Sequence, residues 1–175
     1  KFKDRRSIPI ILMTYLNPVY RYGIEKFAAD CVKAGVDGII IPDVPLEEED
    51  MIARHLGEKG IAHIQLVALT SPEERAKKIA QRSEGFLYAV SVMGTTGARN
   101  HHDEHVKEYL QKLKKISPVP VLAGFGVSNA EQAKTLSSYC DGVIVGSKIV
   151  ELFHEGRSEE IKNLIQKSTL VNMNA

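Results

Sequence analysis

Six short apolar runs, spaced about one βα unit apart, are the feature of this 175-residue sequence that most limits its fold. The runs are rich in β-branched residues and lack the apolar–polar alternation of a strand with one solvated face. Strands of this kind are buried on both faces, as parallel strands covered by helices are. The runs are residues 9–15, 38–43, 63–69, 85–92, 119–123 and 142–145.

The segments between these runs carry helical patterns. Two helices are expected to begin with a capping box, one formed by Ser71 and Glu74 and the other by Ser128 and Glu131. Gly35 stands where a C-cap glycine would end an earlier helix. The apolar residues at helical spacing are Ile24, Phe27, Ala28 and Cys31; Ala76, Ile79 and Ala80; Val106, Leu110 and Leu113; and Ala133 and Leu136.

Alternating strands and helices leave two architectures, an open doubly wound sheet and a closed (β/α) barrel. An open sheet normally has a glycine-rich turn after its first strand, whereas residues 14–18 contain no glycine. The unusual polar and glycine residues follow the later strands, at the end where barrels assemble their sites. We therefore predict an α/β fold of the (β/α)8 TIM-barrel type in a single domain over residues 1–175, with residues 168–175 as a loosely held tail.

Composition excludes several classes of function. Lys and Arg number 23 against 22 for Asp and Glu, so there is no large positive field for general binding to nucleic acid. No apolar run approaches the roughly 20 residues of a membrane span. Cys31 and Cys140 lie far apart in apolar contexts, which favours reduced thiols and a cytoplasmic location.

Glycine-rich loops after the last two strands give the strongest local signal, at residues 124–128 and 145–150. A phosphate needs several converging backbone N–H donors, glycine permits the close approach, and a helix N-terminus adds a favourable dipole. Barrels often build a phosphate site from the loops after strands 7 and 8. Tight strand-to-helix turns are the alternative explanation of the same glycines.

A long polar loop, residues 93–100, follows the fourth run and is expected to close over a site. Asp43 ends a wholly apolar strand, which predicts a carboxylate at the barrel mouth. Its role stays open between orienting a polar partner, proton chemistry and holding a turn. Tyr15 and Tyr88 hold similar strand-end positions, where aromatic residues are as often part of the core.

A cluster of histidines and acids at residues 101–105 invites a metal interpretation, but it lies on a polar loop entering a helix, and we predict no metal site. The sequence contains no nucleophile elbow, P-loop or dinucleotide fingerprint.

Taken together, five segments resemble the tryptophan synthase alpha subunit, in the same order and at the right spacing. The resemblance covers the chain up to about Leu164. The segments are residues 9–17 (PIILMTYLN), 37–48 (DGIIIPDVPLEE), 85–97 (GFLYAVSVMGTTG), 124–128 (GFGVS) and 143–150 (VIVGSKIV).

This resemblance implies a lyase of tryptophan biosynthesis that cleaves indole-3-glycerol phosphate to indole and glyceraldehyde 3-phosphate. The reaction is a retro-aldol cleavage and implies no cofactor. It also implies a partner, the beta subunit, which uses pyridoxal phosphate to join indole to serine in an alpha2-beta2 heterotetramer.

The resemblance also implies roles for particular residues. Phosphate binding falls to Gly97, Gly126, Gly146 and Ser147. Tyr15 and Phe125 line the indole pocket, Tyr88 lies near the glycerol part of the substrate, and Thr96 is the threonine of the mobile loop. Asn17, Asp43 and Pro45 match the interface with the beta subunit.

The family's catalytic glutamate and aspartate match no residue of this sequence, because they belong to a segment that would precede Lys1. The six runs are then strands 3–8 of a barrel, without its first two βα units. The expectation is that the chain alone turns over little or not at all. Two other interpretations remain: another barrel enzyme acting on a phosphorylated sugar, and a non-catalytic fragment that self-associates through its open strand edges.

Overall fold

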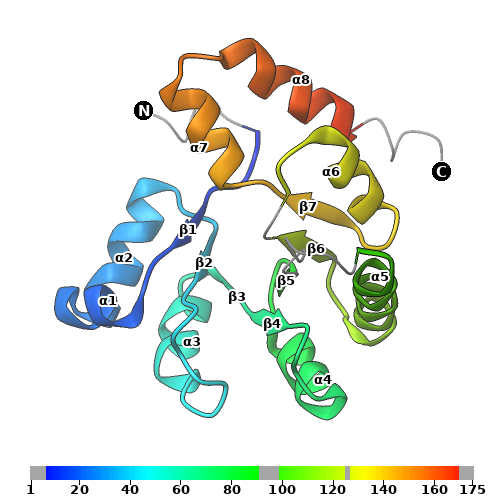
Figure 1. Cartoon of the computed structure of the whole chain (residues 1–175). Helices are drawn as coiled ribbons and strands as arrows, with labels where there is room; N and C mark the ends of the chain where they lie inside the picture. Colours follow the sequence, from blue (N-terminus) through cyan, green and yellow to red (C-terminus); the bar gives the residue numbers. More distant parts are fainter. Residues whose placement is uncertain (1–6, 91–98, 125–126, 170–175) are drawn as a thin grey trace.

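The computed structural model describes residues 7–90, 99–124 and 127–169, in which parallel strands alternate with helices (Figure 1). The elements are β1 (Ile11–Met13), α1 (Leu16–Tyr22), α2 (Ile24–Ala34), β2 (Gly38–Ile40), α3 (Asp50–Gly57), β3 (Ala62–Ile64), β4 (Leu66–Ala68), α4 (Glu73–Arg82), β5 (Leu87–Val90), α5 (Arg99–Ile116), β6 (Val121–Gly124), α6 (Ala130–Ser137), β7 (Gly142–Ile144), α7 (Ser147–His154) and α8 (Ser158–Thr169).

The strands form two consecutive parallel ladders, in the orders β1-β2-β3 and β4-β5-β6-β7. Within each ladder, every strand pairs with the next one along the chain, as in a (β/α) barrel, and Figure 1 shows the strands as an arc with the helices outside it. The described residues include no ladder between β1 and β7. The prediction of an α/β fold of the barrel type is confirmed for this arc.

The third predicted strand, residues 63–69, is divided into β3 and β4 at Gln65, so its prediction as one strand was wrong. The backbone N–H of Gln65 donates to the Ser83 hydroxyl at 3.0 Å instead of to a neighbouring strand. In the same way the N–H of His63 donates to the Glu84 carboxylate at 2.9 Å. At this point, therefore, side chains of the two residues after α4 accept backbone N–H groups of residues 63 and 65, in place of backbone carbonyls of a neighbouring strand.

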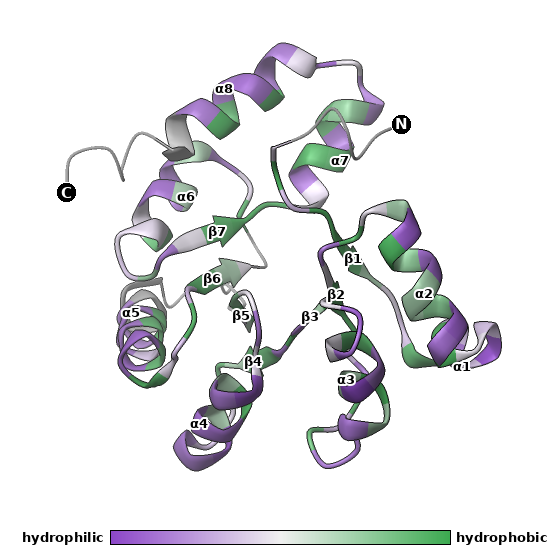
Figure 2. Ribbon diagram, turned by 180° about the vertical axis from the view of Figure 1, so that it is seen from behind, coloured by the Kyte–Doolittle hydropathy of each residue, from purple (hydrophilic) through white to green (hydrophobic). Residues whose placement is uncertain are grey.

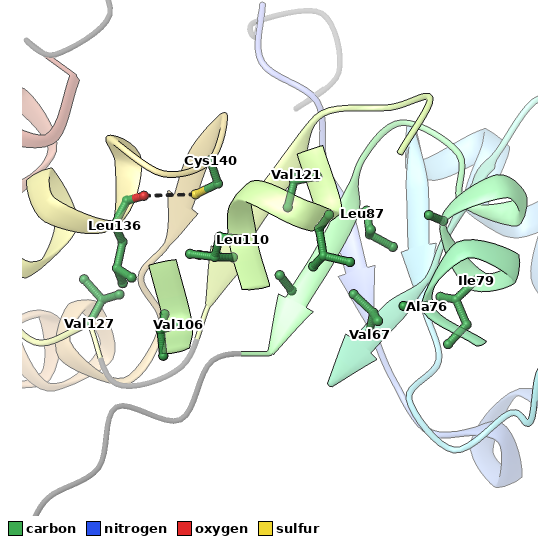
Figure 3. Packing of buried hydrophobic residues seen from close by; sticks show 14 of the residues in the cluster. Val67, Ala76, Ile79, Leu87, Val106, Leu110, Val121, Val127, Leu136 and Cys140 are labelled. Carbon is green, nitrogen blue, oxygen red and sulfur yellow. Dashed lines mark hydrogen bonds between the residues drawn. The ribbon is translucent and has the colours of Figure 1, made fainter. Parts of the chain in front are cut away.

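Buried side chains form a layer on each face of the strands. Ile40, Ile64 and Tyr88 form a cluster on one face, the inside of the arc, whereas Ile39 and its equivalents on the other strands pack against the helices. The larger of the two helix-side clusters lies between β4–β7 and helices α4–α6, and Figure 3 shows its packing. Strands buried on both faces explain the uninterrupted apolar runs of the sequence.

Helix faces follow the predicted periodicity. Val106, Leu110 and Leu113 are at most 1% exposed on α5, and Figure 2 shows apolar colour where helices meet the strands. Gly35 ends α2 at a φ of 80°, and its N–H donates to the Cys31 and Val32 carbonyls. This left-handed C-cap is confirmed, and glycine adopts it without strain.

Both predicted capping boxes were wrong in their residues. Pro72 is the N-cap of α4 and provides no side-chain cap, so Ser71 does not cap that helix. The N-cap of α6 is Asn129, whose side-chain oxygen accepts from the Gln132 N–H at 2.9 Å. The Gln132 side chain accepts from the N–H of Ser128, the residue before the N-cap, so it does not form the reciprocal bond to the N-cap N–H of a capping box.

Apolar side chains are exposed at the β1 end of the arc and on α7. The exposed fractions are 71% for Ile8 and 54% for Met13 beside β1, and 68% for Val150 and 75% for Phe153 on α7. The division into domains stays a prediction. Of the expected tail, Ser168 and Thr169 belong to α8, and residues 170–175 lie outside the described ranges.

Candidate functional site

Most of the described residues singled out by the sequence follow the carboxyl ends of strands, and parallel strands bring those ends to one edge of the arc. Tyr88 does not: it lies within β5, paired with Leu66 and Leu122, so its prediction as a strand-end residue was wrong. Tyr15 follows β1, Asp43 follows β2, and Gly146 follows β7. Four further candidates, Thr96, Gly97, Phe125 and Gly126, lie outside the described residues. The site is therefore built here from β1, β2, β5, β6 and β7 with the helices that follow them.

The turn from β7 into α7 is suited to an anion. Gly146 is the N-cap of α7 and Ser147 its first residue, and both are exposed. A Cβ on Gly146 would meet no atom within 4 Å, so the backbone is open to a ligand. The first turn contains no acidic residue. The Ile149 N–H donates to the Gly146 carbonyl at 2.9 Å, whereas the N–H groups of Ser147 and Lys148 lie at the helix start, where no residue of the helix can accept from them. A phosphate at this point would gain both hydrogen bonds and the helix dipole.

Tyr88 lies inside the arc, 6% exposed, against Ile40 and Ile64. Its ring crosses Gly124 on the neighbouring strand so closely that a Cβ on this glycine would overlap the ring and the hydroxyl. Burial raises the pKa of the Tyr88 phenol, which keeps it neutral. Glycine at the end of β6 therefore makes room for an aromatic side chain, a role that the sequence analysis did not assign to Gly124.

Asp43 and the start of α1 are joined directly. Asp43 Oδ1 accepts the Leu16 N–H at 2.9 Å, which supplies α1 with the cap that its own N-cap residue, Tyr15, does not provide. Asn17 is the residue after Leu16, in the first turn of α1. Pro45 is exposed two residues later, and Tyr15 is 65% exposed. In the described structure Asp43 therefore caps α1 from the loop after β2.

A buried polar cluster beside this loop was missed by the sequence analysis. It contains Glu49, His63 and Gln65, which are 4%, 3% and 9% exposed. Gln65 Nε2 lies 2.6 Å from Glu49 Oε2 and 3.1 Å from His63 Nδ1. The available signal was the presence of His63 and Gln65, two polar residues at alternate positions, within an apolar run.

A hollow of about 250 Å³ lies between α4 and α5, in the helix layer. Tyr109 lines it, and the buried hydroxyl of this residue has no hydrogen-bond partner among the described residues. Burial raises the pKa of the Tyr109 phenol. None of the residues expected at the site lines this hollow, so it is not part of the candidate site.

Within the described ranges, no group of three or more His, Cys, Asp and Glu side chains is placed to hold a metal ion. None of the described helices is both long enough and apolar enough to cross a membrane.

An arc of parallel strands inside a layer of helices, with an open helix N-terminus at the carboxyl ends of the strands, places the chain in the (β/α)-barrel class. The family model of the tryptophan synthase alpha chain matches residues 1–175. The chain belongs to the tryptophan synthase alpha chain family.

Individual relatives agree with the family model. The tryptophan synthase alpha chain of Oceanobacillus iheyensis is 60% identical over 166 residues, which are 95% of this chain and 63% of the relative. That of Bacillus thuringiensis subsp. konkukian is 51% identical over 164 residues, 94% of this chain and 64% of the relative. The chain thus spans less than two thirds of the length of these relatives.

Solved structures give the same result for the fold. A structure of the tryptophan synthase α2β2 complex from Pyrococcus furiosus matches with a TM-score of 0.81 at 37% identity, over 97% of this chain and 69% of that chain. The tryptophan synthase alpha subunit of Campylobacter jejuni matches with a TM-score of 0.80 at 31% identity, over 86% of this chain and 60% of that chain.

Proposed function

We propose that this chain contributes to the alpha reaction of tryptophan synthase, the retro-aldol cleavage of indole-3-glycerol phosphate to indole and glyceraldehyde 3-phosphate. The observation that carries the proposal is the open N-terminus of α7 at Gly146 and Ser147, in a chain that matches the family throughout. A phosphorylated substrate is the kind of ligand such a helix end binds.

The proposed roles are those that the resemblance to the family implies. Gly146 and Ser147 bind the phosphate, together with Gly97 and Gly126. Tyr88, whose ring lies inside the arc, borders the glycerol part of the substrate. Tyr15 and Phe125 line the indole pocket, and Thr96 acts from the loop after β5.

Cleavage of the substrate needs protonation of the indole ring at carbon 3 and a base for the glycerol hydroxyl. Burial raises the pKa of the Tyr88 phenol, which favours its neutral form. We propose, from the resemblance to the family, that carboxylates from the part of the family's barrel that this chain does not match carry out the proton transfers. The chain described here then provides binding, and turns over little by itself.

A beta subunit is the proposed partner, and one solved relative is described as an α2β2 complex. Asn17, Asp43 and Pro45 form the proposed contact, supported by the hydrogen bond that joins α1 to the loop after β2. The alpha reaction itself is proposed to need no cofactor, since pyridoxal phosphate belongs to the partner. Both cysteines are free and buried, which supports the cytoplasm as the compartment.

The test measures indole release from indole-3-glycerol phosphate by this chain mixed with the part of the Oceanobacillus iheyensis relative that it does not match. We expect release from the mixture and little from either part alone. Gly146→Asp should raise KM on the order of tenfold, because it puts a negative charge at the phosphate site. The matched control is Gly57→Asp, at another glycine with open space around it, on α3.

If the mixture releases no indole, the proposal that this chain contributes to the alpha reaction is wrong. Turnover of a different phosphorylated sugar in the same assay would favour another barrel enzyme.

The exposed apolar residues beside β1 and on α7 support a second candidate, a self-associating fragment without activity. Light scattering distinguishes this candidate, because it requires a stable assembly of copies of the chain and no turnover in the mixture.

A further inference from the structure

The loop after β2, residues 43–49, is held to its surroundings at several points. Asp43 bonds to α1, as described above. The Leu46 carbonyl accepts from Arg82 Nη1 at 3.1 Å, at the far end of α4. Within the loop, the Glu48 N–H donates to the Pro45 carbonyl at 2.9 Å. These contacts hold the loop in place before a partner binds, which lowers the cost of ordering it on contact.

Glu49 is the last residue of this loop, and its carboxylate is buried. Its side chain is 6% exposed, and both carboxylate oxygens have a donor. Oε1 accepts from Arg82 Nη1 at 2.9 Å, and Oε2 accepts from Gln65 Nε2 at 2.6 Å. A carboxylate removed from water in this way is tolerated because it is paired with a cation and hydrogen-bonded.

Gln65 connects Glu49 to the sheet. It lies at the break between β3 and β4, and its backbone N–H donates to Ser83, the residue next to Arg82. The break in the third strand and the end of α4 therefore meet at the same carboxylate.

We infer that Glu49, Gln65 and Arg82 form a latch that holds residues 43–49 in the conformation that docks the partner subunit. The inference rests on the proposed function, because the partner surface at Asp43 and Pro45 belongs to it. The three residues are positioning residues. Gln65 and Arg82 hold the loop through Glu49 on its buried side, and the exposed side of the loop makes the contact with the partner. Moving the loop away would break both hydrogen bonds of Glu49 and leave the buried Gln65 amide without this acceptor, so the latch keeps the surface preformed before binding.

The exposed pair Arg75–Glu47, at 2.7 Å, also joins α4 to this loop. Both side chains are about half exposed or more, and exposed pairs of this kind contribute little. In the Arg82–Glu49 pair the arginine is 47% exposed but the glutamate only 6%, so the contacts of Glu49 contribute more to holding the loop than the Arg75–Glu47 pair does.

The experiment compares Glu49→Gln and Arg82→Gln with the unchanged chain. Amide hydrogen exchange at Leu16 and Glu48, the donors that report on the loop, should accelerate about tenfold in both variants. Titration with the tryptophan synthase beta chain of Oceanobacillus iheyensis should show an affinity lower by about tenfold. The matched control is Arg54→Gln, which breaks an exposed pair with Glu58 on α3 and should change neither measurement.

Unchanged exchange at both amides in a folded variant would overturn the latch. Faster exchange with unchanged affinity would overturn its docking role. If the unchanged chain binds no beta chain, the proposed partner and the docking role both fail, while exchange still decides whether the latch exists. If Arg82→Gln does not fold, Glu49→Gln decides, since it keeps the size and shape of the side chain.

Discussion

At the scale of single residues, the positions of Gly124 and Asp43 are each explained by a contact with a residue from another strand or helix. Gly124 is required by the Tyr88 ring that crosses it, and not by its own backbone conformation, since its φ is not in the left-handed region. Asp43 caps a helix from a different βα unit. Both residues were visible in the sequence as strand-end positions, but the partner of each comes from another strand or helix.

Gly124→Ala should destabilise the chain by about 1–3 kcal/mol, because the new methyl group overlaps the Tyr88 ring inside a packed layer. Urea unfolding followed by circular dichroism measures the change. The control is Gly57→Ala on α3, where a Cβ meets no atom within 4 Å and stability should stay equal or rise slightly. Equal stability of both variants would show that Tyr88 does not occupy this place.

At the scale of elements, helix and strand positions were predicted well and their ends less well. The periodicity of the apolar residues identifies α2, α4, α5 and α6, because each buries one face against the strands. The N-caps of α4 and α6 were assigned to the wrong residues. Near each helix start, several neighbouring residues could act as the N-cap, and the direction from which the chain enters the helix decides which one does. The break at Gln65 depends on Ser83, which only the fold brings near.

Asn129→Ala should cost about 1 kcal/mol of stability, since it removes the side-chain cap of α6. Ser71→Ala should have little effect, because Ser71 caps no helix. Thermal unfolding of the two variants side by side tests the reassigned caps. A larger loss of stability in Ser71→Ala than in Asn129→Ala would support the capping box predicted from the sequence at Ser71 and Glu74.

At the scale of the whole molecule, the polar cluster couples stability to pH. Burial lowers the pKa of His63 from its usual value of 6.5, with Glu84 acting weakly in the opposite direction. Gln65 donates to Nδ1 of His63 and to Glu49, so the arrangement needs a neutral imidazole.

Stability contributed by His63 should be complete above pH 6.5 and decrease as the pH falls through the lowered pKa of the folded state, because the unfolded chain binds the proton more strongly. Urea unfolding midpoints between pH 7.5 and about pH 5 measure this loss. Glu49 acts in the other direction, since burial raises its pKa and favours its protonated form as the pH falls. The comparison therefore uses His63→Gln, which should flatten the part of the slope due to His63; an unchanged slope would contradict the assignment.

The sequence by itself determined the class of fold, the order of the strands and the family. A strand buried on both faces gives an uninterrupted apolar run, and a helix with one buried face gives apolar residues at helical spacing, so both can be recognised from neighbouring residues. The sequence also located positions at the carboxyl ends of the strands, including Gly146 and Ser147, since a glycine between an apolar run and a helical pattern marks the turn from strand to helix. Only the tertiary structure decided which side chains meet: Tyr88 with Gly124, Asp43 with α1, and Glu49 with Gln65 and Arg82. Those contacts join residues far apart in the chain, and packing density and hydrogen-bond geometry select them in three dimensions.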